Sequence, residues 1–319
     1  MLTDSEEFKF AGISTFMRAP YVSIDSLEGF DVGILGIPLD YGTSYRQGAK
    51  DGPRSIREHS HWDRVDGSTY VDLNTSRLHT SNNLRIADLG DIHITPSDPE
   101  KTNHDITAAV REIRQRTFPL ILGGDHSITY ASFRGCAEGL NDAQKPLGLL
   151  HFDAHPDVEK GYLSLPRVWH GNPFRMLIDE GYLKGEHMVT IGPRGLIAKQ
   201  WFDYSKDKRI TMISAPETIR RGVEATIQTA IQYLRDRCAA VYVSFDIDCL
   251  DPADAPGTGT PSVGGLRAAE VIPAMRMLRE LPVAGFDLTE VAPHLDPSGR
   301  TMVVANDLLW NFLSFGLKQ

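Results

Sequence analysis

Short, continuous apolar runs alternate with stretches of helical periodicity, and this alternation constrains the fold more than any other feature. The apolar runs span residues 31–38, 120–122, 147–152, 188–191, 241–245 and 283–286. Between them, apolar residues recur at helical spacing in residues 106–113, 227–234, 269–278 and 308–315. Continuous apolar runs are expected for strands that are covered on both faces. The chain is therefore predicted to be an α/β protein with helices on both faces of a parallel sheet.

Composition bounds the class of protein. The chain has 319 residues, of which 41% are apolar, and no internal repeat or linker interrupts it, so a single domain over residues 1–319 is predicted. A net charge of −9 without a basic cluster disfavours nucleic acid and anionic membranes as partners. The acidic residues 1–7 contain no apolar signal core, and no run of about 18 apolar residues predicts a membrane span. Three widely spaced cysteines fit a cytoplasmic location.

Three motifs rich in histidines and carboxylates lie at the ends of predicted strands. His151–Asp157 and Ser244–Pro252 place such residues at alternate positions directly after an apolar run, and Gly123–Ser127 adds another histidine. Alternate residues of a strand point to the same side. In open α/β sheets, ligands bind outside the carboxyl ends of the strands. The three motifs therefore predict one shared site at this edge of the sheet.

The residue types in these motifs indicate a site for more than one divalent metal ion. The predicted ligands are His126, Asp153, His155, Asp157, Asp246 and Asp248. Carboxylates and imidazoles suit Mn²⁺, Co²⁺, Ni²⁺ or Zn²⁺, and the lack of cysteine ligands disfavours a structural zinc site. Two ions that share Asp153 and Asp246 as bridges would use all of these ligands. Such a pair, about 3.5–4 Å apart, can turn a bridging water into hydroxide at neutral pH.

On these motifs, the chain resembles the ureohydrolases, the family of arginases and agmatinases. Gly123–Ser127, Asp153–Asp157 and Ser244–Asp248 match the family's three metal motifs. The stretches that resemble the agmatinase branch are residues 42–48, 52–57, 256–261 and 264–266. The resemblance implies an arginase-like, three-layer α/β/α sandwich around a central parallel sheet. It also implies two divalent ions per chain, Mn²⁺ in most members and Ni²⁺ in some, and a homotrimer or homohexamer.

The resemblance also assigns catalytic roles. Glu290 matches the family's guanidinium-binding glutamate, which would hold the substrate by charge-assisted hydrogen bonds. His170 matches a histidine that passes a proton to the leaving amine, a role that suits an ordinary pKa of about 6.5. Asp157 would accept a proton or hydrogen bond from the bridging water. The implied reaction cleaves a guanidino C–N bond and releases urea and an amine, as in the conversion of agmatine to putrescine and urea.

The residues expected around the substrate tail depart from the agmatinase pattern and leave the small-molecule guanidino substrate open. The candidates for substrate binding are Glu159, Arg167, Trp169, Asn172 and Arg194. Glu159 would pair with a cationic amine such as that of agmatine, whereas Arg167 or Arg194 would pair with the carboxylate of 4-guanidinobutyrate. A tight pocket capped by Trp169 would suit guanidine or a biguanide such as metformin.

Three alternatives differ from a self-sufficient agmatinase. The same site could act on another guanidino acid, on guanidine or on a biguanide, with nickel as the metal. The chain could be one subunit of a hetero-oligomer with a paralogue, although a scaffold subunit has no reason to keep all six ligands and Glu290. Amide hydrolysis of the histone-deacetylase kind requires one zinc ion and fewer carboxylates. The number of ions per chain distinguishes this last alternative.

Overall fold

An eight-stranded parallel sheet forms the centre of the computed structural model, which describes residues 12–73, 75–141 and 145–318. The strand order is β4-β1-β5-β10-β9-β6-β7-β8. The strands are β1 (Val32–Gly36), β4 (Ile86–Asp91), β5 (Phe118–Leu122), β6 (Leu147–Phe152), β7 (Met188–Ile191), β8 (Thr211–Ile213), β9 (Ala240–Asp246) and β10 (Val283–Thr289). The acidic residues 1–7 lie outside the described residues.

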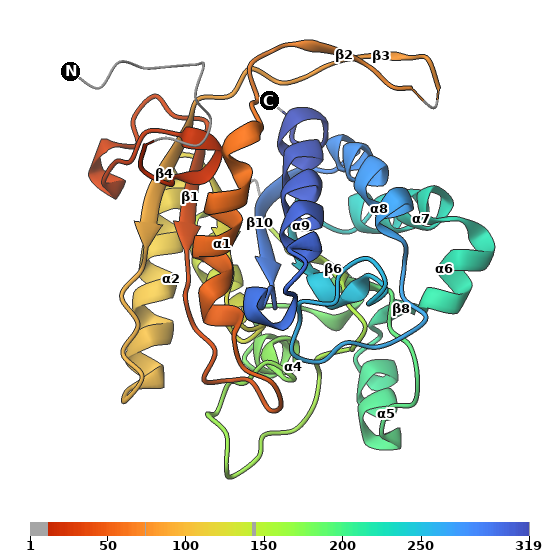
Figure 1. Ribbon diagram of the computed structural model, residues 1–319. Coiled ribbons are helices and arrows are strands. Elements are labelled where there is room, and N and C mark those ends of the chain that lie inside the picture. The colour runs from red at the N-terminus through yellow and green to blue at the C-terminus, as the bar shows by residue number, and fades with distance from the viewer. Residues whose placement is uncertain (1–11, 74, 142–144, 319) are drawn as a thin grey trace.

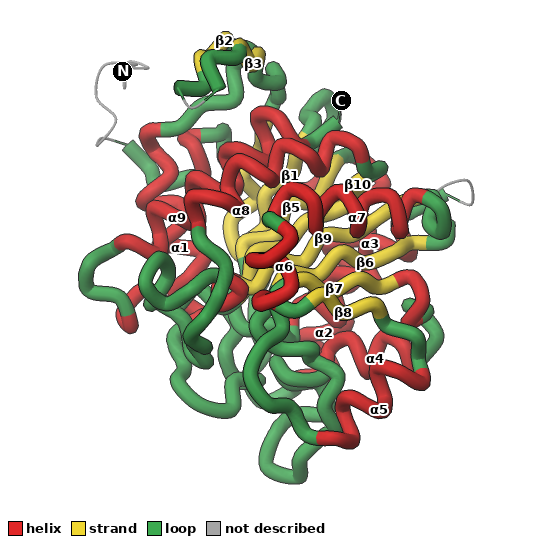
Figure 2. Tube along the Cα trace, turned by 90° about the vertical axis from the view of Figure 1, so that its right-hand side faces the viewer, coloured by secondary structure: helices red, strands yellow, loops and turns green. Residues whose placement is uncertain are grey.

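Helices cover both faces of the sheet (Figures 1 and 2). One layer contains α2 (Pro99–Arg116), α3 (Ile128–Gly139), α4 (Pro173–Asp179) and α5 (Lys199–Asp207). The other contains α1 (Gly52–His59), α6 (Ala215–Arg221), α7 (Val223–Arg235), α8 (Ala268–Ala274) and α9 (Arg300–Asn311). The three-layer α/β/α prediction is therefore confirmed.

Alternation along the central strands creates two hydrophobic cores. In β5, Leu120 and Leu122 belong to the core beneath α7, α8 and α9, whereas Ile121 belongs to the core beneath α2 and α3. Successive side chains of a strand point to opposite faces, so one continuous apolar run supplies both layers. All of these residues are fully buried. The central strands are thus held from both sides, which makes their carboxyl ends a rigid base for a site.

The six predicted strands are all present, but the sequence did not indicate the two edge strands. Edge strand β4 reads Ile-Ala-Asp-Leu-Gly-Asp, and β8 has three residues that are mostly half-buried. Such strands pack against fewer neighbours and carry a weaker apolar signal. The predicted helix over 269–278 is also divided, because Pro273 lies in α8 and a 3₁₀ segment, Met275–Glu280, follows.

One further element lies outside the sandwich. A short antiparallel hairpin of β2 (Thr69–Val71) and β3 (Leu78–Thr80) projects beyond the layers (Figure 1). Among the described residues, no helix combines the length and apolar character that a membrane crossing requires.

Candidate metal centre and substrate cavity

The four central strands end at the same level, and this brings the predicted ligands together. Leu122 of β5 pairs with Leu288 of β10, Leu288 pairs with Phe245 of β9, and Phe245 pairs with Phe152 of β6. The three metal motifs and Glu290 begin within one to four residues of these paired positions. Residues that are remote in sequence therefore meet at one edge of the sheet, where α/β proteins generally bind ligands.

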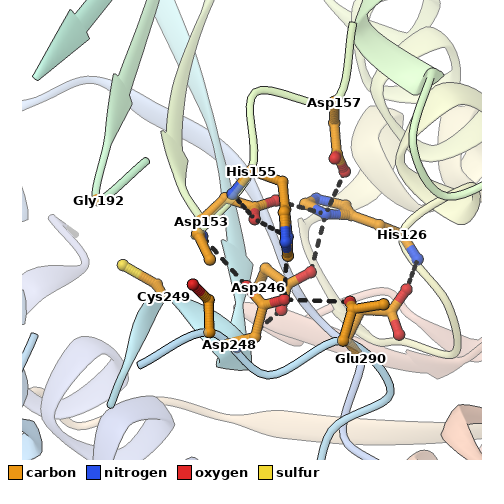
Figure 3. Close-up of polar contacts among 12 residues, drawn as sticks. His126, Asp153, His155, Asp157, Gly192, Asp246, Asp248, Cys249 and Glu290 are labelled. Atoms are coloured by element: carbon orange, nitrogen blue, oxygen red, sulfur yellow. Dashed lines mark hydrogen bonds and ion pairs between the residues drawn. The ribbon is translucent and has the colours of Figure 1, made fainter. Parts of the chain in front are cut away.

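His126 is the centre of the first group of ligands. Its Nδ1 lies 3.0 Å from an oxygen of Asp153 and 3.1 Å from oxygens of Asp157 and Asp246 (Figure 3). All four side chains are almost completely buried. Despite these short distances, Nδ1 makes no correctly aligned hydrogen bond to any described residue. A nitrogen lone pair and several carboxylate oxygens that converge in this way suit a cation better than they suit one another.

His155 completes a second group of ligands. Its Nδ1 lies 3.4 Å from Asp153 Oδ1 and 3.2 Å from Asp248 Oδ2. Asp153 thus contributes Oδ2 to the group around His126 and Oδ1 to the group around His155. Ligand atoms of His126, His151, Asp153 and Asp157 lie within 4.8 Å of one another, and so do those of Asp153, His155 and Asp248, which is the spacing of a metal site. A shared carboxylate between two ligand groups fits the donor set of a binuclear centre.

Tight turns, rather than extended strand, present the alternating ligands. Asp153 Oδ1 accepts a hydrogen bond of 2.6 Å from the backbone N–H of His155, and Asp246 Oδ1 accepts one of 2.7 Å from that of Asp248. Aspartate favours this type of turn because its short side chain reaches the backbone two residues ahead. Asp153 and His155 therefore approach the same point, and so do Asp246 and Asp248. Strand alternation predicted this convergence, but the turns produce it.

A chain of buried polar groups orients the His126 ring. His126 Nε2 lies 2.9 Å from Ser244 Oγ, and Ser244 Oγ donates to Asp287 Oδ1 over 2.6 Å. Asp287 also accepts hydrogen bonds from Thr129 and Tyr242, each 2.9 Å long. Because the Ser244 proton is directed toward Asp287, Ser244 Oγ is free to accept from Nε2–H. That arrangement leaves the Nδ1 lone pair for a metal ion, as is usual for metal-bound histidines.

The electrostatics of the site indicate an excess of buried negative charge. Burial raises the pKa of Asp157, and the charge of Asp153 adds to the effect, so that this pKa reaches about 6. Burial together with the charges of Asp248 and Asp153 raises the pKa of Asp246 well above its ordinary value. Burial alone would lower the pKa of His126, but its carboxylate neighbours raise it well above the usual range. Bound cations would allow every carboxylate here to remain ionised.

His170 and Glu290 form a buried pair beside the metal ligands. His170 Nδ1 lies 3.0 Å from Glu290 Oε1, which also accepts a hydrogen bond of 2.9 Å from the backbone N–H of His126. Burial lowers the pKa of His170, but the bond to Glu290 outweighs it and raises this pKa to about 9. Burial raises the pKa of Glu290, whereas His170 lowers it below the ordinary value, which is the net direction. The pair is therefore ionised at neutral pH.

Backbone strain is concentrated at two residues of the site. Asp157 and Glu290 have φ angles of 48° and 62°, in the left-handed region that disfavours residues with a side chain. Such conformations cost about 1–3 kcal/mol each and persist where the surrounding structure requires them. Glu290 is held by its backbone N–H, which donates to Gly124 O over 2.9 Å. This strained turn directs the carboxylate back toward the strand ends.

A cavity of about 410 Å³ opens above the metal ligands. It is lined by Ser44, His155, Asp157, Glu159, Tyr162, Ser164, Leu165, Trp169, His170, Gly171, Asp246 and Thr260. The predicted substrate residues Glu159 and Trp169 are among them. Trp169 is almost completely buried, and its indole N–H donates to Lys160 O over 3.3 Å. The indole thus forms a fixed wall of the cavity.

The structure does not bring the other three predicted substrate residues into the cavity lining. The Arg167 guanidinium donates to Glu180 and Glu100 on the outer surface, over 2.6 and 3.1 Å. Asn172 is buried and supports the turn before α4, where its Oδ1 accepts from the backbone N–H of Trp169 over 2.9 Å. Arg194 donates to backbone carbonyls, including that of Asp248 at 2.7 Å. These contacts stabilise the walls of the site and do not reach its interior.

Two lining residues, Ser44 and Thr260, were not singled out from the sequence, whereas Tyr162, Ser164 and Leu165 belong to the loop over residues 160–169 that is expected to cover the substrate tail. Ser44, Tyr162, Ser164, Leu165 and Thr260 come from loops without regular secondary structure. Hydroxyl and small apolar side chains in loops carry no spacing that would distinguish them from ordinary loop residues. The resemblance of residues 42–48 to the agmatinase branch was the available signal for Ser44.

Comparison with known proteins agrees with this geometry. The sequence matches the arginase family over residues 30–314. It is 37% identical to guanidinopropionase of Pseudomonas aeruginosa over an alignment of 307 residues. This alignment covers 96% of this chain and 92% of that protein. It is 35% identical to the mitochondrial agmatinase of Gallus gallus, with 95% and 85% covered. The solved structure of proclavaminate amidino hydrolase from Streptomyces clavuligerus aligns with a TM-score of 0.83 and 35% identity, with 96% and 97% covered.

The chain therefore belongs to the arginase family, the ureohydrolases. It is a metal-dependent amidinohydrolase of guanidino compounds, and the family uses a binuclear divalent metal centre. This conclusion agrees with the resemblance drawn from the three motifs.

Proposed function

We propose that this chain hydrolyses a guanidino C–N bond in agmatine or a close relative and releases urea and an amine. One observation carries the proposal: two joined groups of metal ligands lie beside an ionised His170–Glu290 pair at the base of one cavity. The metal ligands and this pair provide separate places for a nucleophile and for a planar cation. A guanidinium needs both, because its resonance makes attack by free water very slow.

The donor set fits two divalent ions. His126, Asp153, Asp157 and Asp246 would hold one ion, and His155, Asp153, Asp246 and Asp248 would hold the other. When bound, such a pair of ions supplies an activated water at neutral pH. Mn²⁺ is the proposed metal and Ni²⁺ the alternative, since both accept carboxylate and imidazole ligands.

Glu290 is suited to hold the guanidinium. Its Oε1 is occupied by the backbone N–H of His126 and by His170, which fixes the carboxylate in one orientation. Gly259 leaves room beside Oε2, which lies 3.6 Å from where a Cβ on that glycine would be. Oε2 could accept charge-assisted hydrogen bonds from the planar N–H groups of a guanidinium. Glu290 would thereby orient the carbon to be attacked toward the metal ligands.

His170 is suited to donate the proton that the leaving amine requires. Its pKa of about 9 means that the ring carries a proton at neutral pH. It lines the cavity and directs Nδ1 to Glu290, so Nε2 is the atom from which a proton can leave. The Asp157 carboxylate also lines the cavity and provides a place for a proton released during hydrolysis.

A cationic tail is the best match for the outer cavity. Glu159 is the ionisable residue in the lining that contributes no proposed metal ligand or catalytic group, and the described lining contains no lysine or arginine. Burial and the charge of Asp157 raise the pKa of Glu159 to about 7, so a cationic amine beside it would favour its ionised form. An amine at the end of the substrate could pair with Glu159, whereas the carboxylate of a guanidino acid would be repelled. The relatives include both an agmatinase and a guanidinopropionase at similar identity, so the side chains of the lining, and not sequence identity, favour agmatine.

The family resemblance supports a homotrimer or homohexamer, and the three widely spaced cysteines fit a cytoplasmic location. The chain retains every proposed metal ligand together with His170 and Glu290, which favours a self-sufficient enzyme over a scaffold in a hetero-oligomer. Size and composition of the purified assembly would test both points.

Urea release by the purified protein tests the proposal. Samples loaded separately with Mn²⁺ and Ni²⁺ are assayed with agmatine, 4-guanidinobutyrate, arginine, guanidine and metformin, and bound metal is counted in the same samples. Two ions per chain and the highest kcat/KM for agmatine are expected. Protein that binds no metal would overturn the proposed metal centre. A higher kcat/KM with a guanidino acid or a biguanide than with agmatine would overturn the proposal that the substrate has a cationic tail.

A further inference from the structure

The segment Gly42–Gly48 lies against the proposed proton donor, although its sequence contains no metal ligand. The backbone N–H of Gly42 donates to Asp125 Oδ2 over 2.8 Å, and Gly42 O accepts from the backbone N–H of His170 over 3.2 Å. A Cβ at this glycine would lie 2.9 Å from Ser127 Oγ and 3.0 Å from both Asp125 oxygens. Glycine is therefore needed for this segment to approach the strand ends so closely.

Two residues further along, Ser44 meets the outer side of the His170 ring. Its Oγ lies 2.8 Å from His170 Nε2, and its backbone N–H donates to the same atom over 3.1 Å. On the opposite side of the ring, Nδ1 lies 3.0 Å from Glu290 Oε1. Both ring nitrogens thus have polar partners, and Ser44 is a member of the cavity lining. The imidazole is held between a carboxylate and a serine.

We propose that Ser44 is a positioning residue that holds His170 in one orientation while the ring gains and loses its proton. When the ring is charged, Nε2–H can donate to Ser44 Oγ. When the ring is neutral, Nε2 can accept from the Ser44 backbone N–H or hydroxyl. Because one residue offers both an acceptor and donors, Nε2 keeps a partner in either protonation state. This inference rests on the proposed function, in which His170 donates the proton.

The proton step balances within these groups. The leaving nitrogen replaces Ser44 Oγ as the acceptor of Nε2–H; the N–H bond at His170 Nε2 then breaks and a new N–H bond forms at the leaving nitrogen. That nitrogen keeps the electron pair of the cleaved C–N bond, and the imidazolium becomes a neutral imidazole. Ser44 neither gains nor loses a covalent bond. It fixes the direction of Nε2, and general acid catalysis depends strongly on such geometry.

The rest of the segment anchors Ser44. The Arg46 guanidinium donates to Gly259 O over 3.1 Å and to Thr258 O over 2.9 Å, which ties the segment to the loop on the other side of the cavity. Gly42 ties its beginning to Asp125. Ser44 is therefore held from both directions, and its position does not depend on the mobility of a free loop.

Charged groups from three strand ends face the same histidine. Glu290 follows β10, Asp125 follows β5, and Asp157 follows β6; each favours the charged form of His170. Removal of the Ser44 hydroxyl leaves these three carboxylates in place. A change seen in a Ser44 variant can therefore be assigned to the contact at Nε2.

Ser44→Ala tests the inference through turnover. In the metal-loaded enzyme, kcat should fall about tenfold, with KM changed less than about twofold, as expected for loss of one oriented hydrogen bond. The alkaline limb of the pH–rate profile should move to lower pH, because the charged ring loses an acceptor. Ser44→Thr should restore most of kcat. Ser262→Ala is the matched control, since Ser262 contacts Arg194 through its backbone carbonyl.

An NMR titration provides a readout that does not require turnover. In Zn²⁺-loaded protein with ¹³C-labelled histidine, the His170 signal is assigned by its loss in His170→Asn. Ser44→Ala should lower the His170 pKa, and Ser44→Thr should return it toward the natural value. An unchanged pKa, or an unchanged kcat in an enzyme that releases urea, would overturn the role of Ser44. Absence of urea from the natural chain would instead count against the proposed function, while the titration still decides the role of Ser44.

Discussion

The base and the outer wall of the cavity are built differently. At the base, His126, Asp153, Asp246 and Asp248 are almost completely buried and lie at paired strand ends. The outer wall includes Glu159, Tyr162, Ser164 and Leu165, which belong to a loop without helix or strand, and Tyr162 is 49% exposed. A rigid base preserves one reaction, whereas a loop wall can change without disturbing the sheet. The rigid base is therefore expected to fix the reaction, and the loop wall is expected to determine which guanidino substrate binds.

Asp248→Asn should have the largest effect, because it alters the rigid base. His155 would lose the charge of a carboxylate that lies 3.2 Å away, and one ion would be held weakly. We expect urea release to fall about a thousandfold or more, because the activated water depends on the metal centre. Metal analysis after dialysis and the urea assay measure the two effects. Asp203→Asn, on exposed α5, is the control. Full activity with two ions would remove Asp248 from the ligand set.

The ionised pair His170–Glu290 should stabilise the fold in a pH-dependent manner. The His170 pKa is about 9 in the folded chain and about 6.5 when unfolded. A group whose pKa is raised in the folded state contributes stability that is fully present below its unfolded-state pKa. This contribution is lost as the pH rises through its folded-state pKa. In metal-free protein, the free energy of unfolding of the natural chain should therefore exceed that of the His170→Asn variant by about 3 kcal/mol near pH 6. This gap should shrink by pH 9.

Denaturant unfolding of both chains between pH 6 and pH 9 measures this gap. The comparison removes contributions from titrating groups that do not interact with His170, whereas the pKa values of Glu290 and Asp125 change together with the substitution. His104→Asn, on the exposed side of α2, controls for the loss of a histidine that lies outside the site. A gap that stays constant over this range would show that His170 does not gain its charge from Glu290.

Glu290→Gln should separate substrate binding from metal binding. Glu290 contacts His126 through a backbone N–H and is not a proposed ligand, so both ions should remain. Loss of the charged partner of the guanidinium should lower kcat/KM about a hundredfold, since hydrogen bonds to charged groups contribute about 1.5–3 kcal/mol. Metal counting and steady-state kinetics give the two values. Loss of metal in this variant would place Glu290 with the rigid base as a ligand.

The same contrast determines what could be read from the sequence. The central strands were predictable because each is covered on both faces, and the ligands were recognisable because each motif directly follows such a strand. The polar strand β4 had no such signal. Arg167 shows the limit on the outer wall. Its position in the loop suggested substrate contact, but tertiary packing directs its guanidinium to Glu180 and Glu100. The order of residues in a loop does not specify which side chains face inward.

Glu159→Gln should have the smallest effect and tests the outer wall alone. The substitution removes a charge while keeping the size of the side chain, and the backbone N–H of Glu159 can still donate to Gly171 O. For agmatine, kcat/KM should fall about fivefold, because a partly exposed ion pair contributes about 1 kcal/mol. Guanidine has no tail, so its hydrolysis, if measurable, should be unchanged and provides an internal control. A higher kcat/KM for agmatine, or an equal fall in kcat/KM for agmatine and guanidine, would show that Glu159 does not recognise a cationic tail.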